Sequence, residues 1–117
     1  MAKRADAEKL CRLLSQMRSP DELLALLLSF GTAREDLIAR LQLITEALRD
    51  LLLLSYTENA PLIFFTDRAA AEDLSVCFAA ERLQGFLQAT EQTMETLSMN
   101  ANTRLTLFRY ADLLLKK

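Results

Sequence analysis

The sequence predicts an all-α protein, folded as a single compact bundle of about five to six helices. The chain has 117 residues, the length of one domain. It contains only two glycines and two prolines, too few for the many turns of a sandwich or a barrel. Leucine (26 residues) and alanine (16 residues), both strong helix formers, make up about a third of it. A hydrophobic fraction of 51% and a net charge of −2 are typical of a globular chain.

Two helices are expected in the first thirty residues. The first covers residues 4–17, where apolar residues recur at spacings of three and four: Leu10, Leu13, Leu14 and Met17. A capping box from Ser19 to Glu22, with Pro20 at the first helical position, begins the second. Five leucines between residues 23 and 28 leave this helix little polar face, so we expect it to be buried nearly all round or covered by a partner. Gly31 is its expected left-handed stop.

The third helix is expected from Ala33 to Ser55, with Thr32 and Glu35 as a second capping box. Its apolar residues step by four and three, which is a heptad seam. The seam consists of Leu37, Leu41, Ile44, Leu48 and Leu51. Beyond it, residues 51–54 are all leucine, so this end of the helix is apolar on every side.

Residues 56–66 interrupt the helical pattern, because Pro61 biases Ala60 away from helical angles. The apolar run 62–65 is interpreted as an extended connector that plugs into the bundle, since a lone strand would have nothing to pair with. Thr66 or Asp67 is expected to cap a short helix that ends at Asp73.

The remaining chain predicts two more helices. Ser75 is expected to cap a long helix to Ser98, whose heptad seam consists of Val76, Ala80, Leu83, Leu87, Thr90, Met94 and Leu97. A turn at 100–102 supplies an asparagine cap for the last helix. That helix is expected to carry Leu105, Phe108, Ala111 and Leu115 on one face, and to end in Lys116 and Lys117, which complement its negative end.

Several kinds of chemistry are absent from the sequence. There is no histidine, which excludes Ser-His-Asp triads, Cys-His pairs and imidazole metal sites. Gly31 and Gly85 are isolated, so there is no glycine-rich phosphate loop. Cys11 and Cys77 lie far apart and are expected to be buried free thiols in a reducing cytosol. We therefore expect no enzymatic activity, no cofactor and no metal.

Acidic pairs have a structural interpretation. The pairs 21/22, 35/36 and 72/73 fall where we expect first helical turns or caps, where the helix dipole favours negative charge. Glu91 and Glu95, one turn apart, are expected on a solvated face, because a di-iron bundle would require Glu-x-x-His.

Charge and hydropathy predict neither a membrane span nor a nucleic-acid site. The longest uncharged run, residues 23–33, has eleven residues, whereas a span needs about 20. Residues 1–18 carry a net charge of +3 and residues 19–74 one of −6, so the basic end is best interpreted as a solvated helix face. The excess of leucine has two explanations: complete burial in the bundle, or burial shared with an interface.

Two segments resemble a known family. Residues 49–54 (Arg-Asp followed by four leucines) match a helix end that is typical of the C-terminal domain of the delta-prime subunit of bacterial DNA polymerase III, part of the sliding-clamp loader. Residues 100–107 fit that family's closing Asn-x-Asn-Pro-Arg-Leu-x-Leu helix start, with Thr103 in place of proline and Phe108 where an acid is frequent. The candidate interface or motif residues are Arg49, Asp50, Leu52, Leu53, Asn100, Asn102 and Arg104. Other clamp-loader subunits share the helical collar, but the Arg-Asp-Leu run favours delta-prime.

The resemblance implies a scaffolding role in the bacterial cytoplasm. A domain of this family packs with the equivalent domains of the gamma/tau and delta subunits in a pentameric collar, while ATP hydrolysis belongs to neighbouring subunits. It implies no direct contact with nucleic acid. Because the nucleotide-binding-type module of the family is absent from the sequence, the chain is expected to be an excised domain or a fragment. In isolation it should self-associate weakly or expose a sizeable apolar patch. The alternative is a free-standing helical adaptor or homodimer that shares only the leucine-rich periodicity.

Overall fold

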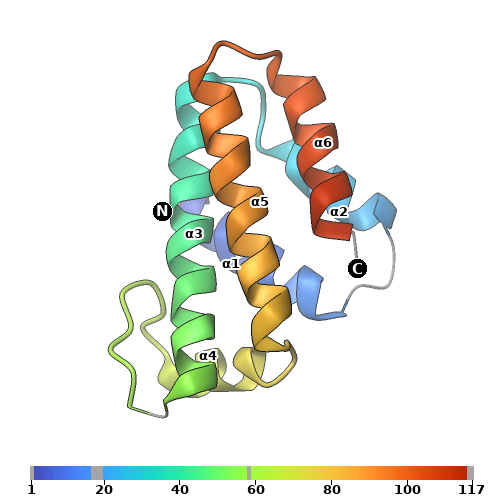
Figure 1. Ribbon diagram of the computed structural model, residues 1–117. Coiled ribbons are helices and arrows are strands. Elements are labelled where there is room, and N and C mark those ends of the chain that lie inside the picture. The colour runs from blue at the N-terminus through green and yellow to red at the C-terminus, as the bar shows by residue number, and fades with distance from the viewer. Residues whose placement is uncertain (1, 17–19, 58, 116–117) are drawn as a thin grey trace.

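The computed structural model describes residues 2–16, 20–57 and 59–115, which fold into a helical bundle (Figure 1). This part of the chain has no strand, so the predicted all-α fold class is confirmed. None of its helices combines the length and the apolar character needed to cross a membrane. The helices are α1 (Ala2–Gln16), α2 (Pro20–Ser29), α3 (Arg34–Tyr56), α4 (Arg68–Ser75), α5 (Ala80–Ser98) and α6 (Thr103–Leu115).

The two longest helices, α3 and α5, form the centre of the molecule and run antiparallel along its 40 Å length (Figure 1). Helix α1 packs against α3, and α6 turns back along α5. Helix α2 packs against α6, while the short α4 lies at the end of α3 that is farthest from the α5–α6 turn. The bundle therefore has two ends: one with the α5–α6 turn, and one with α4 and the connector that precedes it.

The predicted heptad seam of α3 is confirmed, because all of its members are buried. Helix α2 differs from the expectation. Only Leu23 and Leu27 are buried, Leu24 and Leu26 are half-buried, and Leu28 is exposed. The expectation of all-round burial was therefore wrong: α2 presents a two-residue stripe to α6 and α1, and the fold tolerates its other leucines near the surface.

The predicted capping box at the start of α3 is wrong. Ala33 is the N-cap residue, and no side chain caps the helix there. The acidic residues Glu35 and Asp36 lie in the first turn, where they favourably meet the positive end of the helix dipole. The other predicted box begins at Ser19, which lies outside the described residues, as does the predicted core residue Met17.

The boundary between α4 and α5 also differs from the prediction. Asp67 caps α4, as expected, by accepting a hydrogen bond from the backbone N–H of Ala70. Ser75, the predicted cap of the long helix, instead ends α4 and donates its hydroxyl to the Leu51 carbonyl at 3.1 Å. Val76, predicted in the seam, is 83% exposed, and Phe78 is buried in its place. Helix α5 begins four residues later than predicted, at Ala80.

The two glycines should respond oppositely to alanine. Gly31 follows α2 with a φ of +87°, the predicted left-handed stop, so Gly31→Ala should lower the free energy of unfolding by about 1–2 kcal/mol. Gly85 lies inside α5, where an added Cβ would meet no atom within 4 Å. Gly85→Ala should therefore raise the free energy of unfolding by about 0.5–1 kcal/mol. Urea unfolding of both variants measures this, and equal effects would contradict the assigned backbone conformations.

Candidate functional site

The candidate residues from the sequence separate into two groups at opposite ends of the bundle. Asn100 contacts Arg34, the first residue of α3, through a hydrogen bond of 3.3 Å. Asp50 lies sixteen residues farther along the same helix, which corresponds to about 24 Å. The structure therefore does not assemble these residues into a single site, and each group has its own role.

Asp50 organises the connector between α3 and α4. Its side chain is fully buried. One carboxylate oxygen accepts a hydrogen bond from the backbone N–H of Ile63 at 3.0 Å, and the other accepts from those of Phe64 at 2.8 Å and Phe65 at 3.0 Å. An extended segment without a neighbouring strand has no ladder to satisfy these donors. The Asp50 carboxylate accepts these hydrogen bonds instead of a neighbouring strand, and it thereby holds the connector against α3.

The connector plugs into the bundle, as predicted. The rings of Phe64 and Phe65 are buried and meet edge to face, with 5.0 Å between their centroids. The guanidinium group of Arg4 in α1 lies 4.5 Å from the centre of the Phe64 ring and donates to the Phe64 carbonyl. Arg68 donates to the Ala60 carbonyl at 2.7 Å, which ties the two ends of the connector together. The sequence did not single out Arg4, because it is one of five basic residues among residues 1–18, a segment that was interpreted as a solvated helix face.

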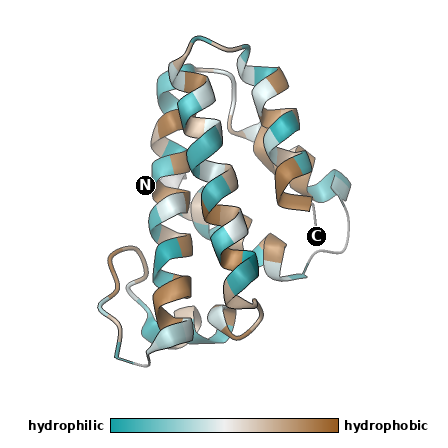
Figure 2. Ribbon diagram, viewed as in Figure 1, coloured by the Kyte–Doolittle hydropathy of each residue, from teal (hydrophilic) through white to brown (hydrophobic). Residues whose placement is uncertain are grey.

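The other candidates on α3 are closer to the surface. Arg49 is exposed, and it makes no hydrogen bond or ion pair with the described residues. Leu52 is half-buried and packs against the core, and Leu53 is half-buried. The predicted all-apolar end of α3 is therefore only partly covered by the bundle. Figure 2 shows this apolar end of the helix as a largely brown ribbon.

The asparagines between α5 and α6 shape the turn, as predicted. Asn100 adopts the left-handed region with a φ of 64°, and its side-chain oxygen accepts from Arg34. The side-chain oxygen of Asn102 accepts from the backbone N–H of Leu105 at 2.9 Å, which caps α6. Arg104 is exposed on the first turn of α6. Asn100 and Asn102 therefore have intramolecular roles, whereas Arg104 remains available to a partner.

The core-facing side of α6 is only partly the predicted one, because Ala111 is buried but two other members of the predicted face are not. Leu105 is 66% exposed and Phe108 is 40% exposed, so they do not belong to the core. Tyr110 is fully buried, and its hydroxyl lies 2.7 Å from that of Thr90 in α5. Thr90 also donates to the Phe86 carbonyl, so it is Tyr110 that donates to Thr90. The buried side consists of Thr106, Leu107, Tyr110, Ala111 and Leu114.

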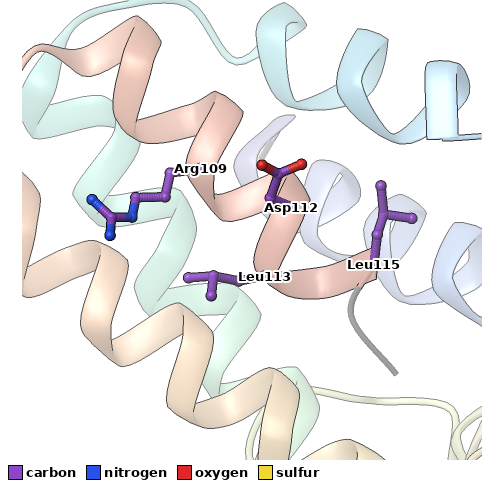
Figure 3. Close-up of a pocket in the computed structure, with 4 residues that line it drawn as sticks. All are labelled: Arg109, Asp112, Leu113 and Leu115. Carbon is purple, nitrogen blue, oxygen red and sulfur yellow. The ribbon is translucent and has the colours of Figure 1, made fainter.

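The outward side of α6 combines apolar and charged residues beside a cavity. The cavity has a volume of about 410 Å³. Figure 3 shows four α6 side chains around it: Arg109, Asp112, Leu113 and Leu115. Arg104, Arg109 and Asp112 form no hydrogen bond or ion pair with the described residues.

Two buried groups titrate abnormally. Burial, with a smaller effect from the Glu8 carboxylate, raises the pKa of the Cys11 thiol from 9.0 to about 12. Burial likewise raises the pKa of the Tyr110 hydroxyl. No group of three or more acidic or cysteine side chains in the described part of the chain is placed to bind a metal.

The two cysteines should differ in reactivity. Cys11 is buried, as predicted, but Cys77 is exposed, so the expectation that both are buried was wrong. A maleimide at pH 8 should label Cys77 only, and both thiols should react in denaturant, because a buried thiol with a pKa of about 12 supplies almost no thiolate. Since Cys11 ionises first in the unfolded chain, stability should also decline as the pH rises from 9.0 towards 12. Mass spectrometry counts the labels, and native labelling of a Cys77→Ser variant would contradict the burial of Cys11.

One signal could have indicated the correct side of α6. Leu107, Tyr110 and Leu114 also recur at spacings of three and four, so the helix carries two apolar stripes. A buried tyrosine hydroxyl needs a polar partner, and Thr90 supplies it for Tyr110. Comparison of the chain with models of protein families, with curated proteins and with solved structures finds no match.

Proposed function

We propose that this chain is a non-catalytic scaffold domain of a DNA polymerase III clamp loader, of the delta-prime type, which packs with other subunits in a collar. The main support for the proposal is the number of large apolar side chains that remain exposed although the bundle has a complete buried core. A packed core occupies the centre of the bundle. The exposed large hydrophobic residues are Leu28, Tyr56, Ile63, Val76, Met99, Leu105 and Phe108.

The two motif segments support the same proposal through their positions. The Arg-Asp-Leu segment contains Asp50, which holds the connector, and the Asn-x-Asn segment contains Asn102, which caps α6. Each segment thus builds one end of the bundle and leaves one arginine, Arg49 or Arg104, exposed to solvent. A domain whose task is to hold neighbours in a ring needs a well-fixed shape with surface left over for contacts.

Pull-down experiments test the proposal. The chain, carrying an affinity tag, is mixed with purified gamma/tau and delta subunits of a bacterial clamp loader, with an unrelated helical bundle as the control bait. We expect both subunits to be retained by the chain and neither by the control. If the chain retains neither subunit, the proposal is contradicted. Light scattering of the chain alone then tests the homodimer alternative: a stable mass of twice 13.2 kDa would favour it.

A further inference from the structure

We infer that the outward face of α6 docks on a helix of the neighbouring subunit, and that this helix carries carboxylates on both sides of its apolar stripe. The inference rests on the proposed function and adds the contact surface and the chemistry of its partner. We define the α6 outward face by its exposed residues: Arg104, Leu105, Phe108, Arg109 and Asp112.

An apolar pair lies at the centre of the α6 outward face. Leu105 and Phe108 are three positions apart, so their side chains are neighbours on the helix surface. They are 66% and 40% exposed. Leu113 and Leu115 extend the apolar character around the 410 Å³ cavity, toward the C-terminal end of the helix (Figure 3). From Arg104 to Leu115 the face is about 16 Å long, which is the length of a three-turn helix–helix contact.

Two arginines that pair with none of the described residues border this apolar pair. Arg104 lies one turn before Phe108, and Arg109 lies one turn after Leu105. Six other arginines are engaged by the fold through hydrogen bonds, ion pairs or ring contacts: Arg4, Arg12, Arg34, Arg40, Arg68 and Arg82. Within the described part of the chain only Arg49, on α3, shares the free state of the two on α6. Cations that flank an apolar contact are complemented by carboxylates on the partner.

The same face argues against two other occupants. A nucleic acid would place phosphates next to Asp112, which lies one turn from Phe108, and the chain as a whole has a charge of −2. A second copy of this chain would bring the same α6 face through a two-fold contact. It would offer Arg104 and Arg109 only one carboxylate, that of Asp112. A helix with its own acidic border satisfies both arginines.

Binding of variants to the gamma/tau and delta subunits tests the inference. The double variant Leu105→Gln/Phe108→Gln removes the apolar pair, and Arg104→Glu/Arg109→Glu reverses the two charges. We expect each to weaken binding to one of the subunits at least tenfold. The affinity of the unmodified chain should fall as the salt concentration rises from about 0.05 to 0.3 M, because salt screens the two arginines. The affinity of the charge-reversed variant should not show this dependence. Circular dichroism confirms folding, which exposed substitutions should leave intact.

Matched controls lie elsewhere on the molecule. Ala69→Gln changes an exposed apolar residue of α4, at the other end of the bundle, and Glu72→Lys reverses an exposed charge on the same helix. Both should bind as the unmodified chain does. Binding that survives in both α6 variants overturns the inference and leaves the proposed function standing. Absence of binding by the unmodified chain overturns both. Tight binding of a DNA duplex through Arg104 and Arg109, or dimerisation lost in the α6 variants, would assign the face to a different occupant.

Discussion

Replacing Asp50 by alanine is expected to lower the free energy of unfolding by at least about 2 kcal/mol. The substitution leaves the buried backbone N–H groups of Phe64 and Phe65 without their acceptor, and also the part-buried N–H of Ile63, which water can reach. Each buried donor left unpaired costs about 1–3 kcal/mol. Because a domain of this size is typically stable by about 5–15 kcal/mol, the loss is a large fraction of the total. Urea unfolding followed by circular dichroism measures it.

The conservative variant Asp50→Asn separates the hydrogen bonds from the packing. Its amide oxygen can still accept from Phe64 and Phe65, but its NH₂ group then faces the N–H of Ile63, two donors together. We expect a destabilisation between zero and that of Asp50→Ala. Asp112→Ala on exposed α6 is the matched control, with an expected change within about 0.5 kcal/mol. If Asp50→Ala lowered the free energy of unfolding as little as Asp112→Ala does, the role assigned to the buried carboxylate would be wrong.

Replacing Leu51 by alanine is expected to cost about 2–5 kcal/mol, because its side chain is fully buried between α3 and its neighbours. The loss combines the transfer of the removed methyl groups with the cavity left behind. Thermal and urea unfolding both report it, and the slope of the urea curve should stay unchanged if the variant remains two-state.

Leu53→Ala is the matched control for this prediction. Leu53 belongs to the same run of four leucines but is half-buried, and we expect its removal to cost about 1 kcal/mol. The difference between the two variants tests which side of an all-leucine helix end faces the core. Equal costs at the two positions would mean that the end of α3 is covered all round.

The parts of the fold that the sequence predicted well are those with a single apolar stripe or an unambiguous cap. The apolar residues of the α3 seam keep the same four-and-three spacing over several turns, so the repeat of Leu37, Leu41 and Leu48 indicates the buried side. Asp67 and Asn102 cap helices because their short side chains reach free N–H groups. Gly31 stops α2 because glycine alone adopts a φ of +87° without strain.

The errors arose where two interpretations fitted the same residues. Ser75 resembled an N-cap, but its hydroxyl satisfies the Leu51 carbonyl, a contact between residues 24 positions apart that no local pattern contains. In α6 both stripes had helical spacing, and the buried Thr90 hydroxyl favoured the stripe with Tyr110. Asp50 matched a family motif, yet its chemistry became visible only once the connector was folded onto it.

The candidate site was only partly predicted for a similar cause. Of the two clusters of motif residues, one proved to hold the connector and the other to shape the α5–α6 turn. The surface that we propose for a partner lies on α6 and includes Leu105, Phe108 and two arginines that pair with none of the described residues. Of these four residues, only Arg104 was a candidate from the sequence. Which apolar residues of α6 are exposed depends on which of its two apolar stripes the bundle buries, and the sequence alone does not decide this.

Sedimentation velocity of the chain mixed with purified gamma/tau and delta subunits tests the central claim most directly. A scaffold domain of a collar is expected to leave the 13.2 kDa boundary and to sediment with both subunits, as one complex that contains one copy of this chain. With the charge-reversed variant Arg104→Glu/Arg109→Glu, one of the two subunits should be lost from that complex at the same concentrations. A chain that sediments alone at every ratio tested would contradict the account.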